Sequence, residues 1–301
     1  MLKTFHLLIT PILVGLLLGL FGATAAHYFR VGILFIEQNS QNYFQHSNSF
    51  IFFFCSLSIS AILLSVIKKI GKIKRWHGPA DTIFAAHRVD NELNVKKGIA
   101  STLAAFVSAG GGASVGQYGP LVHFGATLGA LIKDKFRLPI TTGIFLGSGV
   151  AAAISAGFNA PLAGIVFAHE AILRHFSLKA MAPIALASGT AFAVHNFFWD
   201  ASTPFLQPIS NSPISPMIFI SIVLGPFFGL IAIVFMYIIL AFAKLPRKMG
   251  LTSFQSLLIA IIGLSIIGTF LPEVMGLGTT AIVNLTNGNA LLAVAVAILL
   301  A

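Results

Sequence analysis

The sequence predicts an all-α protein that crosses a membrane several times. Of its 301 residues, 57% are hydrophobic and only 9% are charged, whereas about a quarter of the residues of a soluble domain are charged. Apolar runs near the roughly 20 residues that span a bilayer recur along the chain, at residues 5–36, 49–70, 98–132, 140–168, 179–198, 216–243, 252–271 and 289–301. Glycine and proline interrupt several of these runs, so some helices should break inside the bilayer.

The positions of the basic residues predict the orientation of these helices. Most Lys and Arg lie at Lys3 or cluster in the segments 68–75, 96–97, 133–137, 174–179 and 244–248, and the segments 37–48, 197–215 and 271–288 contain none. Because basic loops stay in the cytoplasm, the N-terminus should be cytoplasmic. The membrane is expected to be the plasma (inner) membrane. The net charge of +10 is then mainly a topology signal that also attracts anions. No nucleic-acid partner is expected.

The first two helices should form an outward and an inward span. The first begins near Lys3 and continues past Pro11 to about residue 38 without a small-residue cleavage site, so we expect a retained helix rather than a signal peptide. The second should end at the basic cluster 68–75. Cys55 is the single cysteine of the chain, which excludes a disulfide framework.

The next segment predicts a re-entrant pair of helices. Pro79 is suited to the first position of a short helix that ends near His87. A further helix should run from Lys96 to about Gly112, and another from Pro120 to Lys133. Since both ends of this stretch are basic and therefore cytoplasmic, the chain must turn within the membrane at its glycine-rich centre. Such irregular backbone is tolerated only where protein or a water-filled cavity surrounds it.

A second break is expected at residues 157–161, before a helix that starts at Pro161. A proline-rich external loop should follow at residues 199–215. Beyond it we expect two more helices joined by residues 244–250, an external segment LPEVMGLG, and an apolar helix that starts at Leu291.

Three Gly/Pro breaks in one apolar half point to an anion site. A helix N-terminus carries about half a positive charge and several unpaired N–H groups. Glycine lets an ion approach the backbone, and proline at the first helical position has no N–H to leave unpaired. Two such helices pointing at one midplane position would bind an anion. The alternative is that these small residues only let helices pack closely.

The motifs around these breaks resemble those of the CLC family of chloride channels and chloride/proton exchangers. GASVGQYGPLVHFGATLGALI resembles the family's Gly-Lys/Arg-Glu-Gly-Pro segment with its following helix. GVAAAISAGFNAPLAGIVFAHE resembles the segment that ends in Phe-Asn-Ala-Pro-Leu-Ala-Gly and Phe-x-x-Glu. HGPADTI occupies the place of Gly-Ser-Gly-Ile-Pro-Glu-Ile, and LPEVMGLGTTAI resembles an external loop before a later helix.

The resemblance implies an architecture and a set of binding residues. Residues 1–198 would form the first CLC repeat and residues 216–301 the start of an inverted second repeat. This second repeat is expected to be incomplete: either the chain is a fragment, or a second polypeptide completes the repeat. The family implies a homodimer with chloride or a similar anion as its substrate. The anion-binding residues would be His77, Gly78, Gly116, Gln117, Tyr118, Gly119, Phe158, Asn159 and Ala160, with N–H groups of the ranges 116–121 and 158–162 as donors.

Three departures from the family pattern bear on mechanism. Tyr118 stands at the gating glutamate, and a neutral phenol cannot compete with the anion as a carboxylate does; it could donate a hydrogen bond, plug the pore or only pack. His77 stands at the coordinating serine and could bind an anion better when protonated, or simply lie at the interface. Glu170 stands at the proton-relaying carboxylate, but pairing with Arg174 one turn on is favoured.

The expected function is therefore passive, channel-like permeation of chloride or a similar anion. A proton-coupled antiporter, a non-conducting truncated homologue and a carrier of another anion such as fluoride remain alternatives. An enzyme is not expected, because the chain has no His-Glu-x-x-His, Gly-x-Ser-x-Gly or P-loop motif. No cofactor and no metal site are predicted.

Overall fold

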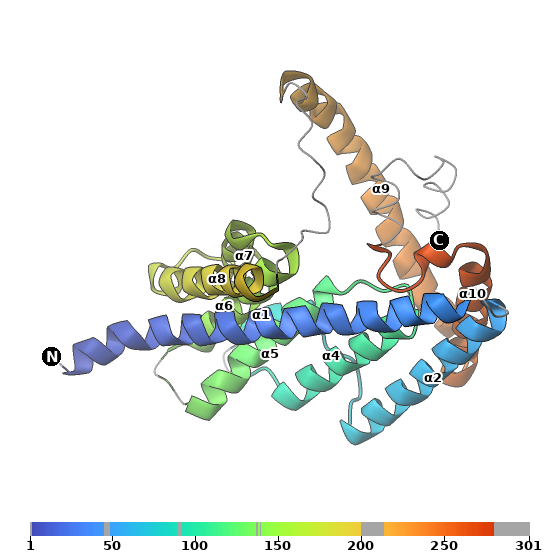
Figure 1. Cartoon of the computed structure of the whole chain (residues 1–301), viewed down its shortest axis with the longest axis horizontal. Coiled ribbons are helices and arrows are strands. Elements are labelled where there is room, and N and C mark those ends of the chain that lie inside the picture. The colour runs from blue at the N-terminus through green and yellow to red at the C-terminus, as the bar shows by residue number, and fades with distance from the viewer. Residues whose placement is uncertain are drawn as a thin grey trace.

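The computed structural model describes residues 2–44, 49–88, 92–136, 138, 140–199 and 214–279, and regular structure within them is entirely helical (Figure 1). The helices are α1 (Leu2–Phe44), α2 (Ser49–Ile70), α3 (Pro79–His87), α4 (Val95–Gly110), α5 (Tyr118–Phe136), α6 (Thr142–Phe158), α7 (Pro161–Phe167), the π-helix η1 (Ala168–Leu173), α8 (Leu178–Trp199), α9 (Ile214–Lys248), α10 (Ser253–Phe270) and the short 3₁₀-helix η2 (Pro272–Val274).

Five of the described helices are long and apolar enough to cross a membrane. The spanning segments are Ile9–Asn39, Ser49–Ile70, Leu178–Trp199, Ile218–Lys248 and Ser253–Phe270. The predicted all-α, multi-pass membrane protein is thus confirmed. The predicted helix from Leu291 and most of the proline-rich loop lie outside the described residues.

Several predicted helix boundaries shift. The short helix from Pro79 and the start at Pro161 are confirmed. However, α1 continues to Phe44, because no glycine or proline stands between residues 38 and 44 to end the helix. The loop expected there rests on polar side chains alone. Helix α5 begins at Tyr118, two residues before Pro120, and runs past Lys133 to Phe136. Its first turn closes ahead of the proline, where the missing N–H would have had no helical partner.

Helices α5 and α6 touch through their backbones at the centre of the fold. A Cβ atom on Gly125 would overlap the carbonyl of Gly149, and a Cβ on Gly149 would overlap the carbonyl of Gly125. Gly129 stands in the same relation to the carbonyl of Phe145. Small residues permit this close approach, which fixes the start of α5 relative to the end of α6.

Helix α1 lies across this pair and alongside α8, as Figure 1 shows. Gly15 and Gly19 face the backbone of α8, so the two long helices also approach closely. A buried cluster joins α1, α5, α6 and α8, with Leu18, Ile33 and Phe145 fully enclosed. This packed unit is the scaffold that holds the helix breaks.

The helices after residue 213 differ from this unit. Within the span Ile218–Lys248 of α9 no residue is buried, and α9 projects away from the packed helices (Figure 1). Helix α10 instead packs on α2, through a small core that contains Phe53, Leu57, Ile261 and Met275.

Candidate functional site

The three Gly/Pro breaks predicted from the sequence meet at Tyr118 and Gly119. The ring of Tyr118 stacks on the ring of Phe158, with centroids 3.8 Å apart. A Cβ on Gly157 would lie 3.4 Å from the Tyr118 ring, and a Cβ on Gly119 would lie 3.7 Å from Cγ of Pro79. The start of α3, the start of α5 and the end of α6 therefore converge on one place.

The N–H groups just before α3 are bonded within the chain. The N–H of Gly78 donates to Oδ2 of Asp81 at 2.9 Å, and the backbone N–H of His77 donates to Oγ of Ser101 at 2.9 Å. Arg75 forms an ion pair with the same Asp81 carboxylate. The N–H of Gly78, predicted to face an anion, is thus occupied by a side chain three residues later.

The Asp81 carboxylate stays ionised because of this bonding. Burial alone would raise its pKa, but the N–H of Gly78, together with His77 and Arg75, outweighs burial and holds the pKa of Asp81 below its usual value. The neighbouring His77 behaves differently. Burial lowers its pKa, Asp81 opposes that shift in part, and Arg75 and Lys97 reinforce it. His77 is therefore mainly neutral at physiological pH.

The start of α5 is open. Within the described chain, the backbone N–H groups of Gly116, Gln117, Tyr118 and Gly119 have no acceptor. Gly116 is exposed, and a Cβ there would meet nothing within 4 Å. The hydroxyl of Tyr118 is buried and likewise has no partner among the described residues. Consecutive unpaired donors at the positive end of a 19-residue helix form a place for an anion.

The break between α6 and α7 is mostly closed. Asn159 adopts a left-handed conformation with φ of 54°, and its N–H and that of Ala160 both donate to the carbonyl of Ser155. The side chain of Asn196 donates to Oδ1 of Asn159 at 2.7 Å. These residues therefore shape the break, and their N–H groups do not offer the bonds to an anion that the sequence predicted. Leu162 supplies the remaining N–H of the predicted range 158–162 that has no acceptor in the described chain.

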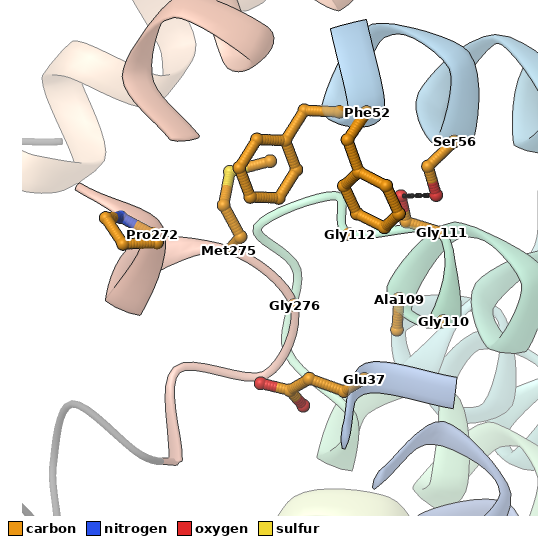
Figure 2. Close-up of a pocket in the computed structure, with 11 residues that line it drawn as sticks. Glu37, Phe52, Ser56, Ala109, Gly110, Gly111, Gly112, Pro272, Met275 and Gly276 are labelled. Carbon is orange, nitrogen blue, oxygen red and sulfur yellow. Dashed lines mark hydrogen bonds between the residues drawn. The ribbon is translucent and has the colours of Figure 1, made fainter. Parts of the chain in front are cut away.

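The segment after α10 holds the glycine-rich turn in place (Figure 2). The N–H of Gly276 donates to the carbonyl of Gly112 at 3.2 Å, and the N–H of Val115 donates to the carbonyl of Gly276 at 3.3 Å. Gly276 has φ of +72°, and a Cβ there would lie 3.2 Å from the carboxylate carbon of Glu37. A cavity of about 40 Å³ remains between these segments. Sequence reasoning missed Glu37, which no motif marks.

Two larger cavities lie on the side of α3. One of about 880 Å³ carries the basic side chains of Arg75, Arg88, Lys96, Lys97 and Lys133 beside the acidic Asp81, Glu92 and Asp134. The other, of about 260 Å³, is lined by polar residues of α4 and α5 and by the start of α3, among them Ser101, Ser108 and His123. His77 lines both cavities and so marks their junction.

The predicted pairing of Glu170 with Arg174 is wrong. Glu170 lies in the π-helix η1, whose wider turn does not place residues four apart above one another. Arg174 ends that helix in a left-handed conformation with φ of 54°, and the ion pairs found among the described residues do not include Glu170. Glu170 is exposed and lies on a different element from Tyr118.

Known proteins resemble the chain in sequence. Residues 59–301 match the family described as voltage gated chloride channel. Over 194 residues the chain is 30% identical to the H(+)/Cl(-) exchange transporter ClcA of Vibrio cholerae, covering 60% of this chain and 40% of that transporter. The transporter of the same name in Salmonella arizonae is 31% identical over 193 residues, with the same coverage. The chain thus spans less than half of the length of these relatives.

Solved structures share the fold. A CLC-type fluoride/proton antiporter superposes with a TM-score of 0.79 at 19% identity, covering 97% of this chain and 75% of that chain. A slow cyanobacterial Cl-/H+ antiporter gives a TM-score of 0.75 at 20% identity, covering 97% of this chain and 70% of that chain. At this identity the likeness concerns the arrangement of helices.

Proposed function

This chain belongs to the voltage-gated chloride channel family, and we propose that it moves chloride or a similar small anion passively across the membrane. One observation carries this proposal: the uncapped start of α5, where four backbone N–H groups and the Tyr118 hydroxyl have no partner within the described chain. An anion there would replace the acceptors that these donors lack.

The route to that site would begin in the basic cavity. Its five cationic side chains outnumber its three acidic ones, so the cavity attracts anions from the cytoplasm. His77 lines this cavity and the smaller one beyond it, which also reaches Pro120 in the first turn of α5. An anion would pass from the first cavity to the second and then to the unpaired donors.

Passive movement is proposed because of Tyr118. A phenol is neutral at physiological pH, so it cannot compete with the anion in the way the family's ionised gating glutamate does. Its ring is stacked on Phe158, and its hydroxyl lacks a partner in the described chain. The side chain would therefore donate a hydrogen bond to the anion from a fixed position.

A second candidate is proton-coupled exchange, as the relatives' names state for those proteins. It would need a protonatable group in place of the missing glutamate. The proposal also includes a homodimer, a cytoplasmic N-terminus and a location in the plasma membrane. It includes no enzymatic activity. Glu170 remains the candidate carboxylate for a proton path in the antiport alternative.

Anion efflux from proteoliposomes, with internal pH followed in parallel, tests the proposal. The parent chain should release chloride without moving protons. Tyr118→Glu should make the flux sensitive to pH, because the carboxylate competes with the anion only when ionised. Tyr118→Phe is the matched control: it keeps the ring and the stacking on Phe158 but removes the hydroxyl, so it should lower flux without adding pH sensitivity. Proton movement by the parent would favour exchange, and no flux from any variant would refute transport by this chain.

A further inference from the structure

A carboxylate borders the cavity between α1, α2, the end of α4 and the segment after α10. Glu37 is partly exposed and lines this cavity of about 40 Å³. Its side chain projects from α1 towards the loop at Gly276, as Figure 2 shows, and a Cβ atom on Gly276 would lie 3.3 and 3.4 Å from the two carboxylate oxygens. Oε2 has no hydrogen-bond partner in the described chain, and the ion pairs found there do not include Glu37.

The surroundings of Glu37 add negative charge and no positive charge. The residues that line the cavity include no basic side chain. The one other charged residue between positions 271 and 279 is Glu273, which is also acidic. Helix α4 ends at Gly110, so its last carbonyl groups carry the negative end of the helix dipole. The carbonyl of Gly110 accepts no hydrogen bond within the described residues. The cavity therefore favours a cation.

The walls of the cavity decide which kind of cation fits. Phe52, Phe53, Pro272 and Met275 make its side-chain walls largely apolar. A metal ion such as Ca²⁺ takes about six to eight oxygen ligands, which these walls do not supply. An alkylammonium ion instead carries N–H donors for a carboxylate at one end and an apolar carbon for the aromatic walls at the other. The cavity exceeds the roughly 10–15 Å³ that one water molecule needs, so a small ion of this kind can enter it.

We propose that this cavity binds a small primary ammonium ion, with Glu37 as its countercharge. The ammonium group donates to the Glu37 carboxylate and to backbone carbonyls at the end of α4, while its carbon lies against Phe52. This inference goes beyond the proposed anion transport, because it concerns a cation and a different group of residues. Since Gly276 also bonds the glycine-rich turn before α5, a ligand beside it should stabilise that turn.

Thermal unfolding of the full chain in detergent tests the site. Methylammonium chloride replaces sodium chloride at constant ionic strength, so the chloride concentration stays the same throughout. The unfolding temperature of the parent should rise with the methylammonium concentration, because a ligand that binds only the folded chain stabilises it. Tetrabutylammonium, whose four butyl groups are too large for the cavity, should give no such rise.

Variants of the carboxylates locate the effect. Glu37→Gln keeps the size of the side chain but removes its charge, so it should weaken methylammonium binding about tenfold. Glu273→Gln is the matched control: it removes a negative charge from a residue that does not line the cavity, and it should keep most of the response. Glu37→Asp retains the charge on a shorter side chain and should respond between the parent and Glu37→Gln. It gives a second reading if Glu37→Gln fails to fold.

The contrary outcomes are equally definite. An unfolding temperature of the parent that is the same in methylammonium and sodium would overturn the site, and this result needs no variant. An equal rise with tetrabutylammonium, or an undiminished response in Glu37→Gln, would also overturn it. Chloride flux without any response to methylammonium would leave the transport proposal standing. A response to methylammonium without flux would uphold the cation site and refute transport alone.

Discussion

The starts of α3 and α5 lie against each other, and each carries a Gly-Pro pair, yet they differ in what they leave unpaired. In α3 the third residue after Gly78 is Asp81, which caps the helix. In α5 the third residue after Gln117 is Pro120, which has neither an acceptor side chain nor an N–H. A Gly-Pro pair thus marks a helix start, and the residues beside it decide whether that start is closed or offers donors to a ligand.

The largest expected effect breaks the contact that positions α5. In Gly149→Ala the new Cβ meets the carbonyl of Gly125 on α5. Overpacking of this kind costs about 3 kcal/mol when backbone must move, so thermal unfolding in detergent should occur at a markedly lower temperature and anion flux should be lost. Gly189→Ala, where a Cβ meets nothing within 4 Å, is the control and should unfold near the parent temperature. Equal behaviour of the two variants would refute the close crossing.

The next prediction concerns the closed break before α7. Asn159→Ala places alanine in a left-handed conformation, which costs about 1–2 kcal/mol, and removes the hydrogen bond from Asn196, which is worth about 1 kcal/mol. Asn159→Gly should lose only the hydrogen bond. Chemical or thermal unfolding should therefore rank the parent above Asn159→Gly and Asn159→Ala lowest. A reversed order of the two variants would contradict the left-handed geometry.

Giving α5 a cap sharpens the contrast between the two starts. In Gln117→Asp the carboxylate can accept from the N–H of Gly119, two residues later, whereas in α3 Asp81 accepts from the N–H of Gly78, three residues earlier. A carboxylate at a helix N-terminus is favourable by up to about 2 kcal/mol, and about 1.4 kcal/mol is a tenfold change in affinity. We expect chloride affinity, measured by flux at varied chloride, to fall about tenfold, while the neutral Gln117→Asn stays near the parent. A fall in both variants would point to lost packing instead.

Removing the cap of α3 has the smallest expected effect. Asp81→Ala should cost about 1 kcal/mol of stability at neutral pH. Burial acts to raise the pKa of Asp81, but the Gly78 N–H, His77 and Arg75 together lower it. The ionised cap therefore stabilises the fold at pH values above the usual carboxyl pKa, and this stabilisation is lost as the pH falls through the lowered pKa. The stability difference from the parent should be constant near neutral pH and shrink below about pH 4. A difference that grows with acid would contradict the assigned direction.

The helices and breaks were largely predictable because glycine and proline act locally. Pro79 and Pro161 each follow a break and stand at the first helical position, so those starts matched, whereas Pro11, Pro183 and Pro226 lie inside helices. The polar side chains after residue 38 misled the prediction of α1, since polarity alone does not end a helix.

The use of each donor was not predictable, because it depends on contacts between distant residues. The sequence does not show that Ser155 accepts from the N–H of Ala160 or that His123 meets Thr82 across 41 positions. Nor does it show Glu37 beside Gly276. Glu170 was paired with Arg174 on α-helical spacing, which the π-helix invalidates.

Anomalous diffraction from crystals grown with bromide tests the central claim most directly. If the open start of α5 binds the anion, a bromide peak should lie within about 3.5 Å of the backbone nitrogen of Tyr118 or Gly119, close to the Tyr118 hydroxyl. Bromide found only in the basic cavity would contradict the account, because that cavity is expected to attract anions without being the binding site. Bromide found only at the start of α3 would also contradict it, because the N–H of Gly78 is already bonded to Asp81.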